Sequence, residues 1–155
     1  MGRLADEIKQ TKPLSMESEI YLNLIRTCFA LLQQESALLK AFGLSGAQYN
    51  ALRILRGAEP EGLKCADISE RLVTKDPDVT RLLDRLESSG LIARRRNDRD
   101  RRVIRARITG AGLGILADLD EPIESLHRRQ LAHMSPATLR ALNALLEEAR
   151  RTVTG

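Results

Sequence analysis

A change of hydrophobic periodicity at Gly90 most constrains the fold of this chain. Upstream, the segment 76–89 carries apolar side chains at i, i+3, i+4 and i+7, the spacing of one buried helix face: Val79, Leu82, Leu83 and Leu86. Downstream, the segment 103–108 alternates between two sets of side chains, which is the period of a β-strand. A helix that ends at a glycine and leads directly into a strand therefore predicts a helix–hairpin unit.

Local signals define the two parts of this unit. A residue before proline avoids the helical region, so we predict Asp76 as the N-cap and Pro77 as the first helical residue. Asp78 then lies in the first turn, where it complements the helix dipole. After Gly90, we predict that residues 91–96 pair with the second strand through the turn "NDRDRR".

The rest of the chain is dominated by helical patterns. Helices are predicted over 18–42, from an N-cap at Ser45 to the loop "RGAEPEGL", and over the short segment "CADISERLV". Thr109 is predicted to cap a long helix that is interrupted at Pro122 and runs to about Met134, and Ser135 to cap the last helix. With aromatic residues at only 3% and no Trp, the core must be aliphatic, and we predict a mostly α fold.

Positive charge is concentrated in the predicted hairpin. Residues 91–108 contain eight Arg and two Asp, a net of +6, whereas the whole chain carries +4, so the remainder carries about −2. A solvated surface usually interleaves both signs, whereas charge collected in one segment predicts a surface that meets a polyanion.

A short helix, a turn and a helix with a cationic exposed face predict a helix-turn-helix that binds double-stranded DNA. We predict the recognition helix (76–89) in the major groove, where Arg81 and Arg85 can reach guanine, and the wing (94–107) at the minor groove. The predicted DNA-binding residues are Asp78, Thr80, Arg81, Arg85, Arg94, Arg96, Arg99, Arg101 and Arg102. The alternative is that Arg81 and Arg85 pair with acidic neighbours on their own helix. We also expect Asp98 or Asp100 to orient the hairpin.

The segment "VTRLLDRLESSGLIARRRNDRDRRVIRARITGAG" closely resembles the recognition helix and wing of the MarR family of bacterial transcriptional regulators. The shared features include an Asp-Arg-Arg in the wing, here Asp100, Arg101 and Arg102, and Thr109 followed by Gly112 at the next helix. The segment "GLSGAQYNALRIL" resembles the second helix of the family, and the likeness covers roughly residues 20–150.

The polar N-terminus predicts a cytoplasmic protein with a disordered tail over 1–17. The resemblance implies a sequence-specific regulator, most simply a ligand-responsive repressor, with a homodimerisation region over 18–42 and 113–155 and a winged helix-turn-helix region over 43–112. The surplus apolar residues of the terminal helices also favour a two-fold partner. A pseudo-palindromic operator with half-sites about one helical turn apart, ~10 base pairs, is expected.

Two control mechanisms stay open in the sequence. Other family members bind small phenolic or aromatic acids, and the candidate pocket residues here are Arg26, Tyr49 and Arg53. An oxidant-sensing repressor acting through Cys28 is the alternative. We favour core packing for Cys28, since the sensing position of the family falls nearer Tyr21, and Cys65 is a weaker candidate still.

Other classes of function find little support. His127 and His133 lie six apart, on different faces of a helix, so we predict surface or interface residues and no metal site. The sequence contains no phosphate-binding loop or nucleophile elbow, which argues against an enzyme and against a cofactor. No apolar run approaches the ~20 residues of a membrane span. A nonspecific architectural DNA-binding protein and a winged helix that binds protein remain as alternatives, although the latter predicts a wing of mixed charge.

Overall fold

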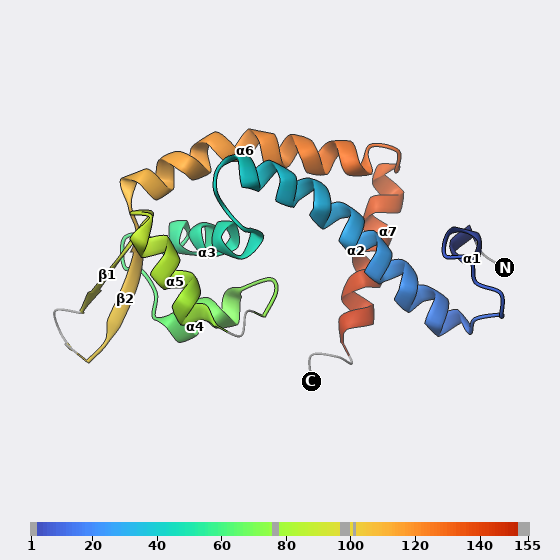
Figure 1. Cartoon of the computed structure of the whole chain (residues 1–155), viewed down its shortest axis with the longest axis horizontal. Coiled ribbons are helices and arrows are strands. Elements are labelled where there is room, and N and C mark those ends of the chain that lie inside the picture. Colours follow the sequence, from blue (N-terminus) through green and yellow to red (C-terminus); the bar gives the residue numbers. More distant parts are fainter. Residues whose placement is uncertain (1–2, 76–77, 97–99, 101, 152–155) are drawn as a thin grey trace.

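The computed structural model describes residues 3–75, 78–96, 100 and 102–151, which form seven helices and one two-stranded sheet (Figure 1). In chain order the elements are α1 (Arg3–Glu7), α2 (Met16–Ala41), α3 (Gly46–Arg56), α4 (Cys65–Arg71), α5 (Val79–Ser88), β1 (Ile92–Arg96), β2 (Ile104–Ile108), α6 (Gly110–Leu131) and α7 (Pro136–Arg150). This order confirms the predicted mostly α fold with a winged helix-turn-helix.

The elements gather into two parts of the molecule. Helices α3, α4 and α5 and the hairpin lie together at one end, from which the hairpin projects (Figure 1). Helices α2 and α6 extend away from this end, and the side chain of Gln130 in α6 donates to the carbonyl of Leu31 in α2 at 3.1 Å. Helix α7 follows α6 at its far end and runs at a steep angle to it, so α2, α6 and α7 form a helical frame that extends from the winged part (Figure 1).

Three of the predicted helix caps are present. The Ser45 hydroxyl accepts the N–H of Gln48, whose side chain accepts the N–H of Ser45, so α3 begins with a capping box. Thr109 and Ser135 likewise accept the N–H three residues later, at the starts of α6 and α7. Because each cap satisfies backbone donors that the first turn leaves free, local sequence sets these helix starts.

The predicted start of α5 is wrong by two residues. Its N-cap is Asp78, whose carboxylate accepts the N–H of Arg81 at 2.9 Å, and the helix runs from Val79. Asp76 and Pro77 lie outside the described residues. Both aspartates are competent N-caps, and the Asp78 carboxylate makes the contact that a cap requires, with the N–H three residues later.

The predicted interruption of α6 at Pro122 is also wrong. The helix is continuous from Gly110 to Leu131 and ends about three residues before the predicted Met134. Proline lacks an N–H and crowds the carbonyl four residues earlier. Here Ile123 and Leu126, on the turn that follows the proline, are buried and hold the helix together across it.

The hairpin forms as predicted, with an additional partner that the sequence did not indicate. Strands β1 and β2 pair antiparallel, with Ile92 opposite Ile108. Leu63, in the loop before α4, exchanges both backbone hydrogen bonds with Ala106 of β2, at 3.0 and 2.8 Å. Gly62 has φ +68, and a Cβ there would overlap the Ala106 carbonyl oxygen. A glycine at this position therefore allows the loop to attach to the wing.

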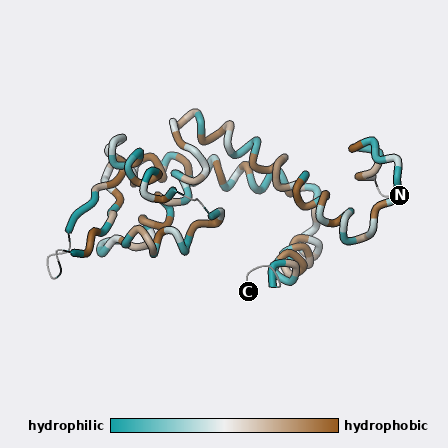
Figure 2. Tube along the Cα trace, turned by 60° about the horizontal axis from the view of Figure 1, so that its bottom comes forward, coloured by the Kyte–Doolittle hydropathy of each residue, from teal (hydrophilic) through white to brown (hydrophobic). Residues whose placement is uncertain are grey.

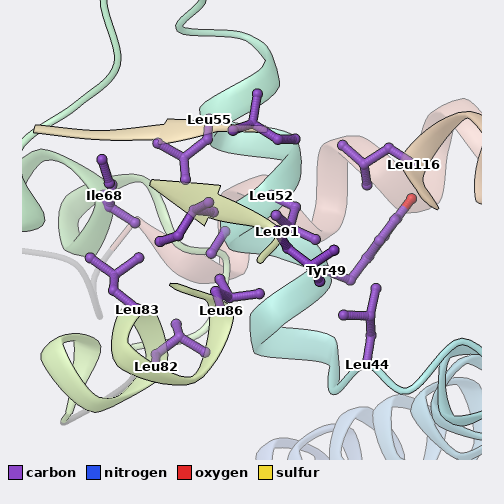
Figure 3. Close-up of a cluster of buried hydrophobic side chains, with 14 of the residues drawn as sticks. Leu44, Tyr49, Leu52, Leu55, Ile68, Leu82, Leu83, Leu86, Leu91 and Leu116 are labelled. Atoms are coloured by element: carbon purple, nitrogen blue, oxygen red, sulfur yellow. The ribbon is translucent and has the colours of Figure 1, made fainter. Parts of the chain in front are cut away.

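The core lies in the winged part and is aliphatic, as predicted (Figure 3). It is formed mainly by buried residues from α3, α4, α5, the hairpin and the first half of α6, among them Leu52, Leu55, Ile68, Leu83, Leu86, Ile92, Leu116 and Leu119. All four residues of the predicted apolar face of α5 are buried. The opposite face of α5 is thereby directed to solvent.

The helical frame, by contrast, leaves much apolar surface exposed. The exposed apolar side chains of α2 form a surface that we call the α2 apolar face: Met16, Ile20, Tyr21, Leu24, Ile25, Phe29 and Leu32. Helix α7 has no buried residue. Figure 2 shows hydrophobic residues along both helices, away from the winged end.

The N-terminal segment differs from the predicted disordered tail. Residues 3–7 form α1, in which Leu4 and Ala5 are buried. Glu7 of α1 forms an ion pair with Arg26 of α2 at 2.9 Å, which attaches this short helix to the frame. None of the helices in the described part of the chain has the length and hydropathy of a membrane-spanning segment.

Candidate nucleic-acid interface

Helices α4 and α5 form the helix-turn-helix, and α3 supports the turn between them. The N–H of Val73 in this turn donates to the side-chain oxygen of Asn50 in α3 at 2.8 Å. With its apolar face in the core, α5 presents Thr80, Arg81, Asp84 and Arg85 to solvent. This placement is the one that a recognition helix requires.

Three of the predicted DNA-binding residues meet on one side of α5. Asp78, Arg81 and Arg85 line a hollow of about 110 Å³ together with residues from the start of α3. Arg81 and Arg85 form no ion pair with any described residue, so the alternative in which they pair along their own helix is not observed. The Asp78 carboxylate caps α5, and this role orients the helix start.

Thr80 lies on the other side of α5, beside the wing. Its hydroxyl is 3.9 Å from the Cys65 sulfur. Both residues line a second hollow, of about 150 Å³, with Arg94 and Ile104 of the two strands. Thr80 therefore lies on a different side of α5 from Arg81 and Arg85.

Arg94 differs from the other candidate arginines that the structure describes, because its guanidinium forms hydrogen bonds with carboxylates of the protein. It bonds to Glu87 and Asp84 of α5, with the shortest N···O distance to each at 2.6 Å. Hydrogen bonds to Glu87 and Asp84 raise the pKa of Arg94, and those from Arg94 lower the pKa of Glu87. The sequence did not indicate these partners, although two acidic residues one turn apart and a following arginine are all visible in it.

Fewer arginines of the wing are available to bind an external anion than its composition predicts, because several already contact groups of the protein. Arg105 donates to the Gly62 carbonyl at 3.0 Å, and Arg107 lies 3.9 Å from a Glu59 carboxylate oxygen. The side chains of these two arginines therefore have partners within the protein. Among the described wing residues, exposed arginines without side-chain partners are Arg95, Arg96 and Arg102.

Part of the predicted wing tip is described. The Asp100 carboxylate accepts the backbone N–H of Arg102 at 3.0 Å, and the Asp100 carbonyl accepts the N–H of Val103, so the contacts of this aspartate are with the backbone of the turn. The candidates Arg99 and Arg101 lie outside the described residues.

The three candidate effector residues do not come together. Tyr49 is buried, and the Arg53 guanidinium lies 5.8 Å from the centre of its ring. Burial raises the pKa of Tyr49, which Arg53 partly offsets. Figure 3 shows Tyr49 near Leu44 and Leu116. Arg26, by contrast, pairs with α1.

Neither cysteine is buried, so the core-packing interpretation of Cys28 is wrong for the single chain. Cys28 and Cys65 are exposed free thiols. His127 and His133 are exposed, as predicted, and His127 lies 4.0 Å from a Glu35 oxygen. Within the described ranges, no group of three or more metal-ligating side chains is arranged to hold an ion.

Comparisons with known proteins converge on one family. Residues 42–103 match the MarR family. A solved MarR transcription factor from Planctomyces limnophilus is 42% identical, with 88% of this chain and 98% of that chain covered and a TM-score of 0.68. The repressor MdtR of Bacillus subtilis is 38% identical over 61% of this chain and 60% of its own length.

The fold is also shared with more distant structures. The MepR–DNA complex of Staphylococcus aureus, 20% identical, superposes with a TM-score of 0.77 over 90% of this chain and 99% of that chain. The chain spans little more than half the length of the first curated relatives that it matches, 52% to 60%.

Proposed function

The chain belongs to the MarR family of transcriptional regulators, and from that premise we propose that it is a homodimeric repressor that binds a specific DNA operator. The observation that carries this proposal is that α5 exposes Arg81 and Arg85, which form no ion pair with any described residue, next to a projecting hairpin. A helix buried on one face and cationic on the other is suited to the major groove.

The proposed contacts fall into two kinds. Arg81 and Arg85 lie one turn apart and reach base edges, where an arginine can donate two hydrogen bonds to the O6 and N7 of guanine. Arg96 and Arg102 lie on the wing and neutralise phosphates at the adjacent minor groove, a contact that sets orientation but reads no sequence. For the wing tip, we predict that Arg99 and Arg101 enter the neighbouring minor groove, where narrow A·T-rich stretches attract guanidinium groups.

The proposed dimer uses the α2 apolar face. Its exposed side chains, with Leu145 of α7 at 62% exposure, form an apolar surface of the kind that marks an interface. A two-fold partner would cover this surface and place a second winged part in the same relation to DNA. We therefore assign residues 18–42 and 113–155 to dimerisation and 43–112 to DNA binding, with a pseudo-palindromic operator.

Selection of bound duplexes from a random pool tests this proposal. We expect an enriched, two-fold symmetric sequence whose half-sites lie about 10 base pairs apart. Affinity for it should fall steeply with salt, with a log–log slope of about −0.9 per phosphate contact. A nonspecific architectural protein would enrich no sequence, and a flat salt response would contradict DNA binding altogether.

Control by a small aromatic or phenolic effector is a secondary proposal, carried by Tyr49 and Arg53. Their stacked side chains lie near the junction of α3 with α6, where Arg56 binds Asp120 through two hydrogen bonds of 2.9 and 3.0 Å. A ligand that separates these helices would change the position of the winged part. We expect aromatic acids or phenols to release the selected duplex, and Tyr49→Phe with Arg53→Gln to prevent release.

A further inference from the structure

Arg94 joins the wing to the recognition helix through four hydrogen bonds. Its Nε and Nη2 donate to Glu87 Oε2 at 2.9 and 2.6 Å, and Nη2 also donates to Asp84 Oδ1 at 2.6 Å. Its backbone N–H donates to Glu87 Oε1 at 2.9 Å. The Arg94 side chain is 28% exposed, less than either carboxylate partner.

The strand register makes this backbone contact possible. Ala106, opposite Arg94, exchanges its backbone hydrogen bonds with Leu63 on the far side of β2. The Arg94–Ala106 pair is therefore not hydrogen bonded across the hairpin, and the Arg94 N–H points away from β2. Glu87 satisfies this outer donor, so one carboxylate holds both the backbone and the side chain of the same strand residue.

The charges of this cluster matter for a helix that approaches DNA. Asp84 and Glu87 lie one turn apart on α5, on the helix that also carries Arg81 and Arg85. Unpaired, the two carboxylates would repel phosphates at the groove. Because Arg94 donates to both, the cluster carries a net charge of about −1 in place of −2.

We propose that Arg94 is a positioning residue for DNA binding. With Asp84 and Glu87 it forms a clamp, the Arg94 clamp, that fixes the wing against α5 and shields two carboxylates from the duplex. Arg94 thus acts through α5 and makes no phosphate contact of its own. The proposal rests on the DNA-binding function proposed above.

A double-mutant cycle tests the Arg94 clamp. Arg94→Gln is measured in the native protein and in an Asp84→Asn/Glu87→Gln background, with the duplex recovered by selection as the probe. We expect Arg94→Gln to raise Kd by about 10-fold or more in the native background, as for a coupled charge pair, and by less than about 2-fold in the neutralised background. If Arg94→Gln raised Kd by the same factor in the two backgrounds, or left Kd unchanged in the native one, the proposal would be overturned.

The salt dependence supplies a readout that separates a clamp from a phosphate contact. We expect Arg94→Gln to leave the log–log slope unchanged. Arg96→Gln, two residues along the same strand and exposed, is the matched control and should reduce the slope by about 0.9. A similar reduction for Arg94→Gln would show that Arg94 meets a phosphate directly.

A measurement on the native protein covers the case in which Arg94→Gln does not fold. In a ¹⁵N NMR titration with the duplex, the Arg94 Nε–H resonance should keep its position while that of Arg96 moves. A shift of both resonances would contradict the clamp. If the native protein showed no preference for any duplex, the proposed function itself would fail, whatever the state of Arg94.

Discussion

Arg85 and Arg96 represent two kinds of contact that single side chains make with DNA. Arg85 lies on the exposed face of α5, and Arg96 ends β1. We expect Arg85→Ala to lose about 1–3 kcal/mol of discrimination between the operator and unrelated DNA, because a base contact is removed. Arg96→Ala should instead weaken binding to all sequences and reduce the salt slope by about 0.9.

Competition titrations with operator and random duplex at several salt concentrations distinguish these outcomes. If both variants lost the same affinity for every sequence, Arg85 would be a phosphate contact like Arg96, and the assignment of α5 to base recognition would be wrong.

Gly62 is a residue whose side chain is excluded by its surroundings. Its φ of +68 is a conformation that residues with a side chain rarely adopt, and a Cβ there would overlap the Ala106 carbonyl. We expect Gly62→Ala to lower the free energy of unfolding by about 1–3 kcal/mol, measured by urea denaturation. Gly46→Ala is the matched control, because nothing lies within 4 Å of a Cβ there. Equal stability of the two variants would show that the loop relaxes without cost.

At the scale of elements, the Arg56–Asp120 pair connects α3 to α6. The Arg56 hydrogen bonds hold the pKa of Asp120 below its ordinary value. A depressed pKa means that the pair stabilises the fold above the unfolded pKa of about 3.9 and that this contribution is lost as the pH falls through the folded value. Both side chains are substantially exposed, at 36% and 52%, so solvent screening keeps the effect small.

We therefore expect Asp120→Asn to lower the free energy of unfolding by about 0.2–1 kcal/mol at neutral pH. The difference from the native protein should vanish once the pH lies below the folded pKa of Asp120, because the native carboxyl is then protonated as well. Chemical denaturation at a series of pH values measures this. A difference that persists in acid would mean that Asp120 contributes through packing.

Element boundaries also show where local sequence suffices. Ser45, Thr109 and Ser135 cap their helices as predicted, since a cap depends on residues within one turn. The start of α5 is predicted at Asp76 because Pro77 follows it, whereas the N-cap in the structure is Asp78, a second aspartate two residues later. The continuity of α6 through Pro122 likewise depends on packing that residues outside the turn provide.

At the scale of the whole molecule, the α2 apolar face predicts the oligomeric state. Ile25 is 55% exposed, so Ile25→Asp should leave the chain folded while placing a charge in the proposed dimer interface. We expect its mass by light scattering to fall from twice 17.3 kDa to a single chain. Val73→Asp, at a residue 86% exposed in the helix-turn-helix turn, should leave the mass unchanged. A native protein of single-chain mass would contradict the dimer.

The candidate site was only partly predictable from the sequence. The exposure of Arg81 and Arg85 follows from the buried stripe of α5, because helical periodicity fixes which side chains share a face. The sequence did not predict that Arg94, Arg105 and Arg107 bind other groups of the protein, since their partners lie on α5 and in the loop before α4. A count of arginines therefore overstates the charge that the wing offers to DNA.

The sequence by itself determined the order of helices and strands, most of their caps, the apolar face of α5 and the location of the positive charge. These features depend on neighbours within one or two turns, and such neighbours are adjacent in the chain. Only the tertiary structure decided which arginines are free, that Leu63 joins the wing, and that Cys28 is exposed. The arginine contacts and the pairing of Leu63 depend on residues from different elements, whose meeting is set by the packing of α3, α5 and β2 and by no local pattern. The exposure of Cys28 depends on what covers its side of α2.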